Sequence, residues 1–102
     1  MTNYVLLYTG GNYPESEEEN AKVMAAWGVW YEKMGPAVVD GGNPFGAAKH
    51  VNGAGTHEGG ASAANGYTII SADSLDTAVA AVQDHPHIAH GGAVSVHETF
   101  QM

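Results

Sequence analysis

The segment that most restricts the fold is a run of five residues near the start of the chain, Tyr-Val-Leu-Leu-Tyr at positions 4–8, in which every residue is apolar or aromatic. Such residues favour a β-strand, and Gly10 and Gly11 then end it. A strand with one face in water alternates apolar and polar residues, whereas a strand covered on both faces is apolar throughout. The pattern predicts a strand with other parts of the protein packed on both of its faces.

The next expected element is an amphipathic helix that stops at Gly35 and Pro36. Ser16 and Glu19 have the spacing of a capping box at its start. The apolar residues of this helix recur every three or four positions, so they share one broad face. They are Val23, Met24, Trp27, Trp30, Tyr31 and Met34.

The rest of the chain supplies three more strands and a second helix. Residues 37–40, 66–71 and 93–100 have strand patterns. Asp73 or Ser74 caps the second helix, and His85-Pro86 is expected to end it. The resulting order is strand, helix, strand, strand, helix, strand. This order predicts an α+β fold of the ferredoxin-like βαββαβ type, which is an antiparallel sheet with both helices on one face.

A Gly-rich excursion, residues 41–65, is inserted between core strands two and three. We expect little regular structure in it, apart from a short edge strand within residues 47–51. With 102 residues, the whole chain (1–102) is predicted to be a single domain.

The expected sheet is covered incompletely by its own chain. The strands at 4–8 and 66–71 carry apolar residues on both faces, yet two helices cover one face of a four-stranded sheet. Closed twofold pairing is the commonest way to cover such a face. The sequence therefore predicts a homodimer.

Charge and composition exclude several classes of function. The formal net charge is −8, from three lysines, no arginine and eleven carboxylates, which argues against nucleic acid and strongly anionic substrates as partners. The absence of cysteine excludes disulfides and thiolate chemistry. No run approaches the roughly 20 apolar residues of a membrane span, and the start of the chain lacks a signal-peptide pattern, so we expect a cytoplasmic protein without membrane contact.

Four segments, taken together, are similar to one protein family. Residues 4–8, the segment Asn43-Pro44-Phe45 with Lys49 shortly after it, residues 66–76 and residues 94–98 resemble the YCII-related family, in its DGPF-type branch. The likeness extends over nearly the whole chain and lies in the order and spacing of short pieces.

The resemblance implies a dimeric α+β barrel, in which two ferredoxin-like sheets pack face to face. Some relatives are suspected enzymes because a histidine and an aspartate meet in a cleft. This chain has no histidine within residues 21–34, where the better-known relatives carry theirs, and Asn43 replaces the aspartate of the DGPF motif.

Three residues are candidates for acid–base catalysis. Asp40 ends a predicted strand before two glycines, where it either acts as a general base or only shapes the turn. His97 lies on the more polar face of the last strand, and His87 lies after the second helix. Each histidine is able to exchange protons near neutral pH, and the alternative is a structural role in a loop or at a dimer contact.

Two other histidine groups are open to interpretation. His85, His87 and His90 have enough imidazoles for a metal site, but their spacing matches no helical ligand pair, so no metal is predicted. His50, in the excursion, is a candidate for covering a pocket, as long loops often do; the alternative is a solvated loop.

A set of aromatic residues predicts either a ligand pocket or a core. The pocket would lie between the first helix and the sheet and would suit a small apolar or aromatic ligand. The candidate lining residues are Tyr8, Trp27, Tyr31, Tyr67 and His50.

Two functions are therefore open from the sequence. The first is a small-molecule-binding protein that acts as a cofactor-independent enzyme through Asp–His chemistry. The second is a non-catalytic dimeric ligand-binding or accessory module. Gly10-Gly11 and Gly41-Gly42 lack the patterns that bind phosphate groups, and no cofactor is predicted.

Overall fold

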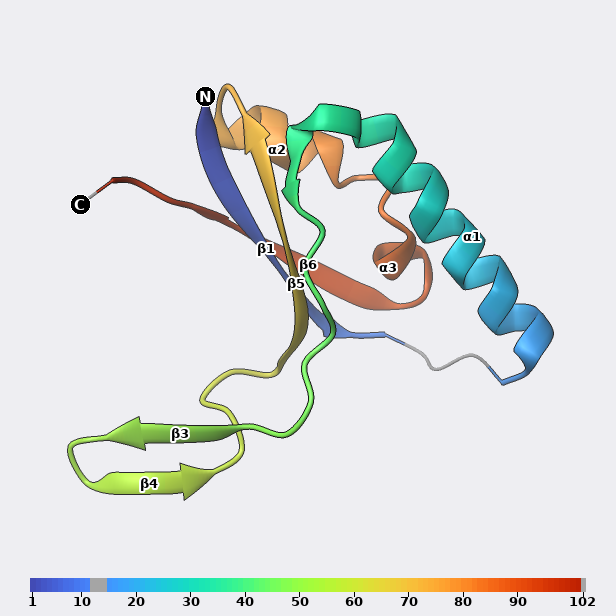
Figure 1. Ribbon diagram of the computed structural model, residues 1–102. Helices are drawn as coiled ribbons and strands as arrows, with labels where there is room; N and C mark the ends of the chain where they lie inside the picture. The colour runs from blue at the N-terminus through green and yellow to red at the C-terminus, as the bar shows by residue number, and fades with distance from the viewer. Residues whose placement is uncertain (12–14, 102) are drawn as a thin grey trace.

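A four-stranded antiparallel sheet forms the centre of the molecule (Figure 1). The computed structural model describes residues 1–11 and 15–101. The sheet has the order β2-β5-β1-β6, and this α+β arrangement is compatible with the ferredoxin-like fold. Its strands are β1 (Thr2–Gly10), β2 (Val38–Asp40), β5 (Ala64–Ala72) and β6 (Gly92–Glu98).

The two central strands, β1 and β5, differ in burial between their faces. Leu6 is fully buried and lies opposite Thr68 and Val96. Leu7, the next residue, is half-buried and lies opposite Tyr67 and Ser95. Alternate residues of a strand point to opposite faces. Within one chain, therefore, only the Leu6 face is covered.

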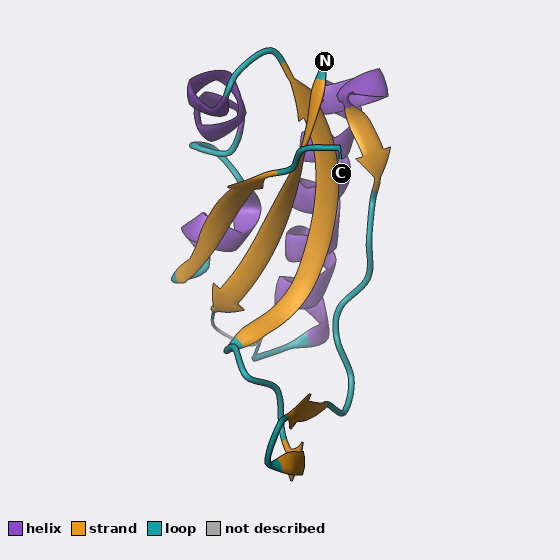
Figure 2. Cartoon of the chain, turned by 90° about the vertical axis from the view of Figure 1, so that its left-hand side faces the viewer, coloured by secondary structure: helices purple, strands orange, loops and turns teal. Residues whose placement is uncertain are grey.

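The covering layer consists of helices on the Leu6 face, and Figure 2 looks onto the face without helices. Ser16 accepts a hydrogen bond from the Glu19 amide at 3.1 Å, which confirms the predicted N-cap. Ser74 caps the second helix by accepting from the Thr77 amide at 3.1 Å. The helical elements are α1 (Glu17–Met34), the 3₁₀ turn η1 (Gly35–Ala37), α2 (Leu75–Ala81) and α3 (Pro86–Ala89).

Helix α1 is anchored near its C-terminal end. Trp30 is 2 % exposed and donates its indole N–H to the Ala81 carbonyl at 3.2 Å. Lys33 pairs with Asp84 beside it. Met24 is 64 % exposed, because the N-terminal half of α1 diverges from the sheet (Figure 1). The predicted apolar face thus divides into a packed part and a part that borders a cavity.

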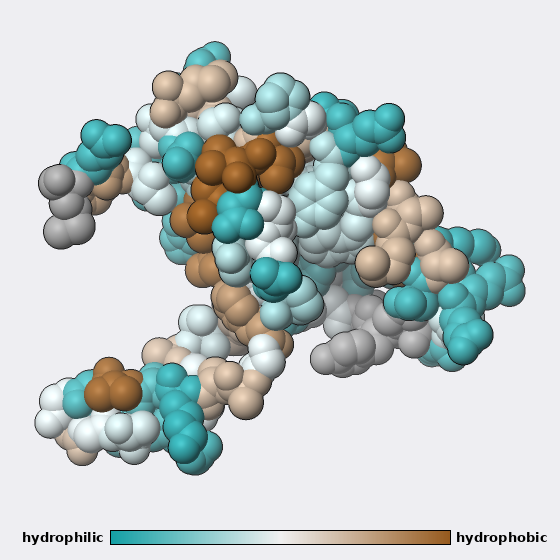
Figure 3. Space-filling model, in the orientation of Figure 1, coloured by the Kyte–Doolittle hydropathy of each residue, from teal (hydrophilic) through white to brown (hydrophobic). Residues whose placement is uncertain are grey.

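The excursion at 41–65 was predicted only in part. The expected edge strand exists as β3 (Lys49–Asn52), but it pairs with β4 (Gly55–Glu58) rather than with the main sheet. The missed signal is the turn between these strands, where Asn52 Oδ1 accepts from the Ala54 amide at 2.9 Å. The hairpin projects as a separate arm (Figure 3).

The end of the second helix also differs from the prediction. Helix α2 ends at Ala81, and His85-Pro86 begins α3 rather than ending α2. Proline suits the first turn of a helix because its missing N–H has no partner there anyway. The His85 Nδ1 atom caps this short helix by accepting from the His87 amide at 3.0 Å. Among the described residues, no helix is both long and apolar enough to cross a membrane.

Candidate functional site

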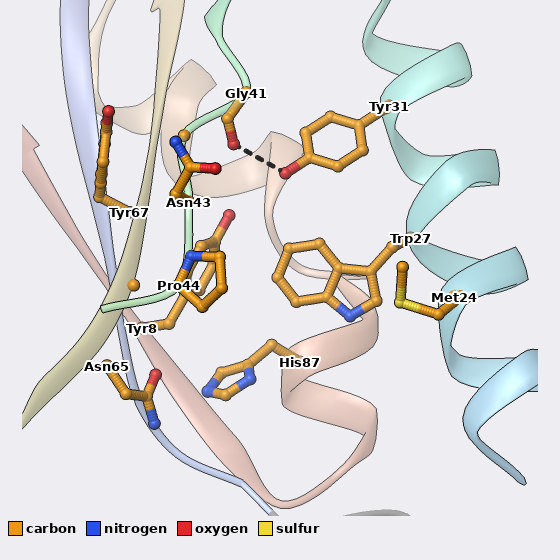
Figure 4. A pocket seen from close by; sticks show the side chains of 12 residues that line it. Tyr8, Met24, Trp27, Tyr31, Gly41, Asn43, Pro44, Asn65, Tyr67 and His87 are labelled. Carbon is orange, nitrogen blue, oxygen red and sulfur yellow. Dashed lines mark hydrogen bonds between the residues drawn. The ribbon is translucent and has the colours of Figure 1, made fainter. Parts of the chain in front are cut away.

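A cavity of about 340 Å³ lies between the diverging half of α1 and the sheet (Figure 4). This volume is within the range of small-molecule sites. Five segments line the cavity: β1, α1, the loop after β2, the start of β5 and α3. The lining residues are Tyr8, Met24, Trp27, Tyr31, Gly41, Gly42, Asn43, Pro44, Asn65, Gly66, Tyr67 and His87.

The aromatic rings of Trp27, Tyr8 and Tyr31 form the main wall of the cavity. The Tyr8 and Trp27 rings meet edge to face, with their centroids 5.2 Å apart. The Trp27 and Tyr31 centroids are 6.0 Å apart. Trp27 and Tyr31 are half-buried, so part of each ring is available to a ligand. Of the five residues predicted to line a pocket, Tyr8, Trp27, Tyr31 and Tyr67 line the cavity, and the rings of the first three form this wall.

A chain of hydrogen bonds, which we call the buried relay, supports the Tyr8 side of the wall. It consists of His85, Tyr8, Thr68 and the Gly41 carbonyl. Because His85 Nδ1 accepts from the His87 amide, its Nε2 carries the proton and donates to the Tyr8 hydroxyl at 3.1 Å. Tyr8 donates to Thr68 Oγ1 at 2.7 Å, and Thr68 donates to the Gly41 carbonyl at 3.1 Å.

The buried relay is electrically neutral. Burial, with a smaller contribution from neighbouring His87, lowers the pKa of His85 to about 4. Burial also raises the pKa of Tyr8 well above its usual value. Neither group is therefore charged at neutral pH, and the relay holds the cavity wall in place. Thr68 and His85 were not predicted as site residues, because their partners are 60 and 77 positions away in the chain.

The low pKa of His85 predicts that the domain loses stability in acid. The unfolded chain takes up this proton near pH 6.5 and the folded chain near pH 4, so the unfolded state holds more protons between these values. We expect His85 alone to remove about 3 kcal/mol of unfolding free energy as the pH falls from 6.5 to 4.

Urea unfolding of the parent protein and of His85→Gln across this pH range measures the contribution. The variant should show the weaker pH dependence, because glutamine does not titrate. His57→Gln, in the hairpin arm outside the main sheet, is the control and should keep the parent slope. Equal slopes for the parent and His85→Gln would show that His85 is not held neutral by burial.

His87 is the histidine that reaches the cavity. Its Nε2 donates to the Thr9 carbonyl at 2.8 Å, so Nδ1 carries the lone pair when the ring is neutral. The ring lies between two glycines: a Cβ at Gly11 would lie 2.8 Å from Cε1, and a Cβ at Gly92 would overlap the ring. Both glycines therefore make room for the imidazole.

A second recess adjoins the cavity. Its volume is about 420 Å³, and it shares Trp27, Pro44, Asn65 and His87 with the cavity. The residues that line the recess alone are Gly10, Gly11, Val23, Phe45 and His90.

Asp40 has a local structural role. It is exposed, and its Oδ1 accepts from the Gly42 amide at 2.9 Å, which forms the turn after β2. Its Oδ2 accepts from the Tyr67 hydroxyl at 3.4 Å. Among the described residues, these are the hydrogen-bond partners of the carboxylate, and neither His87 nor His97 is one of them.

Two other predicted site residues lie on the sheet face without helices. The register places Tyr67 opposite Leu7 and His97 opposite Val5, on the face away from Tyr8. The Tyr67 ring stacks on Phe45 with centroids 5.9 Å apart, so Tyr67 borders the cavity while its ring points to the other face. His97 is exposed in the single chain.

His50 lies in the hairpin arm. Its Nδ1 donates to the Gly59 carbonyl at 3.0 Å, and its ring stacks on His57 with centroids 4.8 Å apart. His50 is not among the described residues that line the cavity. In the part of the chain that the structure describes, no three histidine, aspartate or glutamate side chains cluster in a way that could hold a metal ion.

Comparison with known proteins adds no assignment: no protein-family model matches the sequence, and no curated protein matches it either. The resemblance to the YCII-related family remains a prediction.

Proposed function

We propose that the protein binds a small, mainly apolar molecule with an aromatic or cyclic ring in the cavity between α1 and the sheet. The observation that carries this proposal is the cavity of about 340 Å³ with aromatic walls from Trp27, Tyr31 and Tyr8. Planar rings pack well against such walls, in stacked or edge-to-face contacts.

The hydrogen bonds of the wall's polar groups also favour an apolar ligand. The hydroxyl groups of Tyr8 and Tyr31 are already engaged, the first with Thr68 and the second with the Gly41 carbonyl at 3.0 Å. A ligand therefore gains little from polar groups placed against them. Shape and apolar contact with the rings would provide most of the affinity.

Acid–base catalysis on such a ligand is a second candidate function, and His87 is the observation that favours it. His87 borders the cavity and keeps a lone pair on Nδ1 in its neutral form. The predicted Asp–His pair does not form within the chain, since Asp40 is engaged with Gly42 and Tyr67. Binding without catalysis is thus the function that the geometry favours.

Titration with 2-naphthamide, a neutral bicyclic aromatic probe, tests the binding proposal. At about −0.3 kcal/mol per non-hydrogen atom, a ligand of this size has a dissociation constant of about 1 mM or lower. Calorimetry should detect this binding, and Trp27→Ala should weaken it at least about tenfold, because Trp27 forms the centre of the wall.

The control for this titration is His57→Gln, which changes a side chain of the hairpin arm that lines neither the cavity nor the recess. It should bind the probe as the parent does. The proposal fails if the parent protein does not bind naphthamide, or if Trp27→Ala binds it as tightly as the parent.

We also propose that the chain forms a homodimer. Val5, Leu7 and Ile69 are half-buried on the sheet face without helices, and Val39 is 53 % exposed. A homodimer would cover this apolar face, as in the dimeric barrel of the YCII-related family that the sequence resembles. A cytoplasmic location is part of the same proposal.

A further inference from the structure

The cavity and the adjoining recess together offer space for a ligand with two chemically different ends. They share Trp27, Pro44, Asn65 and His87, so a molecule that packs on one side of Trp27 can extend into the recess. The cavity side has the aromatic rings. The recess side adds the imidazole of His90, which is half-buried.

The linings of the cavity and the recess differ in charge from the rest of this acidic chain. The protein has eleven carboxylates, yet no aspartate or glutamate of the described residues lines the cavity or the recess. No described lysine lines them either. The groups there that can gain a positive charge are His87 and His90. Within the described residues, an amine would therefore have no carboxylate partner in the lining of either space.

Hydrogen-bond donors in the recess match one carboxylate. Asn65 donates one amide N–H to the Gly10 carbonyl at 3.0 Å, which fixes the orientation of its amide and leaves a second N–H. His87 has its Nε2–H committed to Thr9, so Nδ1 is the atom that gains a proton when the ring becomes charged. A doubly charged phosphate would need more positive charge than two histidines provide, especially on a chain with a net charge of −8.

We propose that the ligand is an aromatic carboxylic acid, with its ring against Trp27 in the cavity and its carboxylate in the recess beside His87, His90 and Asn65. This inference rests on the proposed function, because it assumes that the cavity binds an aromatic ring. It adds the chemical class of the ligand and its orientation.

A matched pair of probes tests the inference. The anion 2-naphthoate and the neutral 2-naphthamide share one ring system and nearly one shape, so the ratio of their affinities isolates the effect of the charge. At pH 6.5 we expect the parent protein to bind naphthoate about tenfold more tightly than naphthamide, as charge-assisted hydrogen bonds provide. His90→Gln should reduce this ratio at least about threefold, and His57→Gln, in the hairpin arm away from both spaces, should leave it unchanged.

The outcomes separate this inference from the proposed function. If naphthamide binds and naphthoate binds no more tightly, the aromatic site stands and the carboxylate inference is overturned. If neither probe binds, the proposed function is overturned and this inference with it. If naphthoate is preferred but His90→Gln and His87→Gln both keep the full ratio, the assigned place of the carboxylate is wrong.

Discussion

A chain with Leu6→Glu is expected not to fold. Leu6 is fully buried on the helix-covered face of the central strand β1, between Thr68 and Val96. The substitution removes a buried side chain and places an unpaired carboxylate in an apolar interior, at a cost above about 5 kcal/mol. Domains of this size are stable by roughly 5–15 kcal/mol. Circular dichroism and the melting temperature measure the loss, and a cooperative transition close to that of the parent would contradict the burial of Leu6.

The neighbouring substitution Leu7→Glu is the matched control. Leu7 lies on the sheet face without helices and is half-buried in the single chain, so its carboxylate stays in contact with water and each chain should still fold. If a second copy covers this face, Leu7→Glu would instead dissociate the dimer. Sedimentation analysis should then find twice the mass of one chain for the parent and a single-chain mass for the variant. A parent protein that sediments as a single chain would contradict the proposed homodimer.

Replacing Trp30 with alanine is expected to have the second-largest effect, a loss of about 3–5 kcal/mol. Trp30 is 2 % exposed, and its indole N–H donates to the Ala81 carbonyl. In the variant this carbonyl loses its hydrogen-bond donor. For a domain of this length the melting temperature should fall by at least about 12 °C.

Trp27→Ala provides the comparison for Trp30. Trp27 is only half-buried, because one side of its ring borders the cavity. Its loss should therefore cost less stability than the loss of Trp30 and should act mainly on ligand binding. A larger fall in melting temperature for Trp27→Ala than for Trp30→Ala would mean that the roles of the two tryptophans are reversed.

The order of the main elements could be predicted because it depends on local patterns. The apolar run at 4–8 and the N-cap at Ser16 each act within a few residues, and both are present in the structure. The hairpin of β3 and β4 was missed in part, because its strands are polar and pair only with each other. Hydrophobic periodicity gives no signal for such a segment.

The candidate site was less predictable, since its parts meet only in the folded chain. The wall from Tyr8, Trp27 and Tyr31 was predicted from residue type, and the structure brings these residues together. Tyr67 is also aromatic, but it is the strand neighbour of Thr68. Adjacent residues of a strand point to opposite faces, so the Tyr67 ring lies on the sheet face without helices. His85 was not predicted as a site residue, because its contact with the cavity wall is the hydrogen bond to Tyr8, 77 positions away in the chain.

The two tryptophans also provide the most direct test of the binding site. Their indole N–H signals can be assigned by single substitution and followed during a titration with 2-naphthamide. Trp27 lines the cavity, whereas the Trp30 indole is bonded to Ala81 in the core. We expect the Trp27 signal to shift progressively and to saturate, with a much smaller change for Trp30. If neither signal moves at millimolar probe, or if the shifts instead follow residues of the sheet face without helices, the cavity is not the binding site.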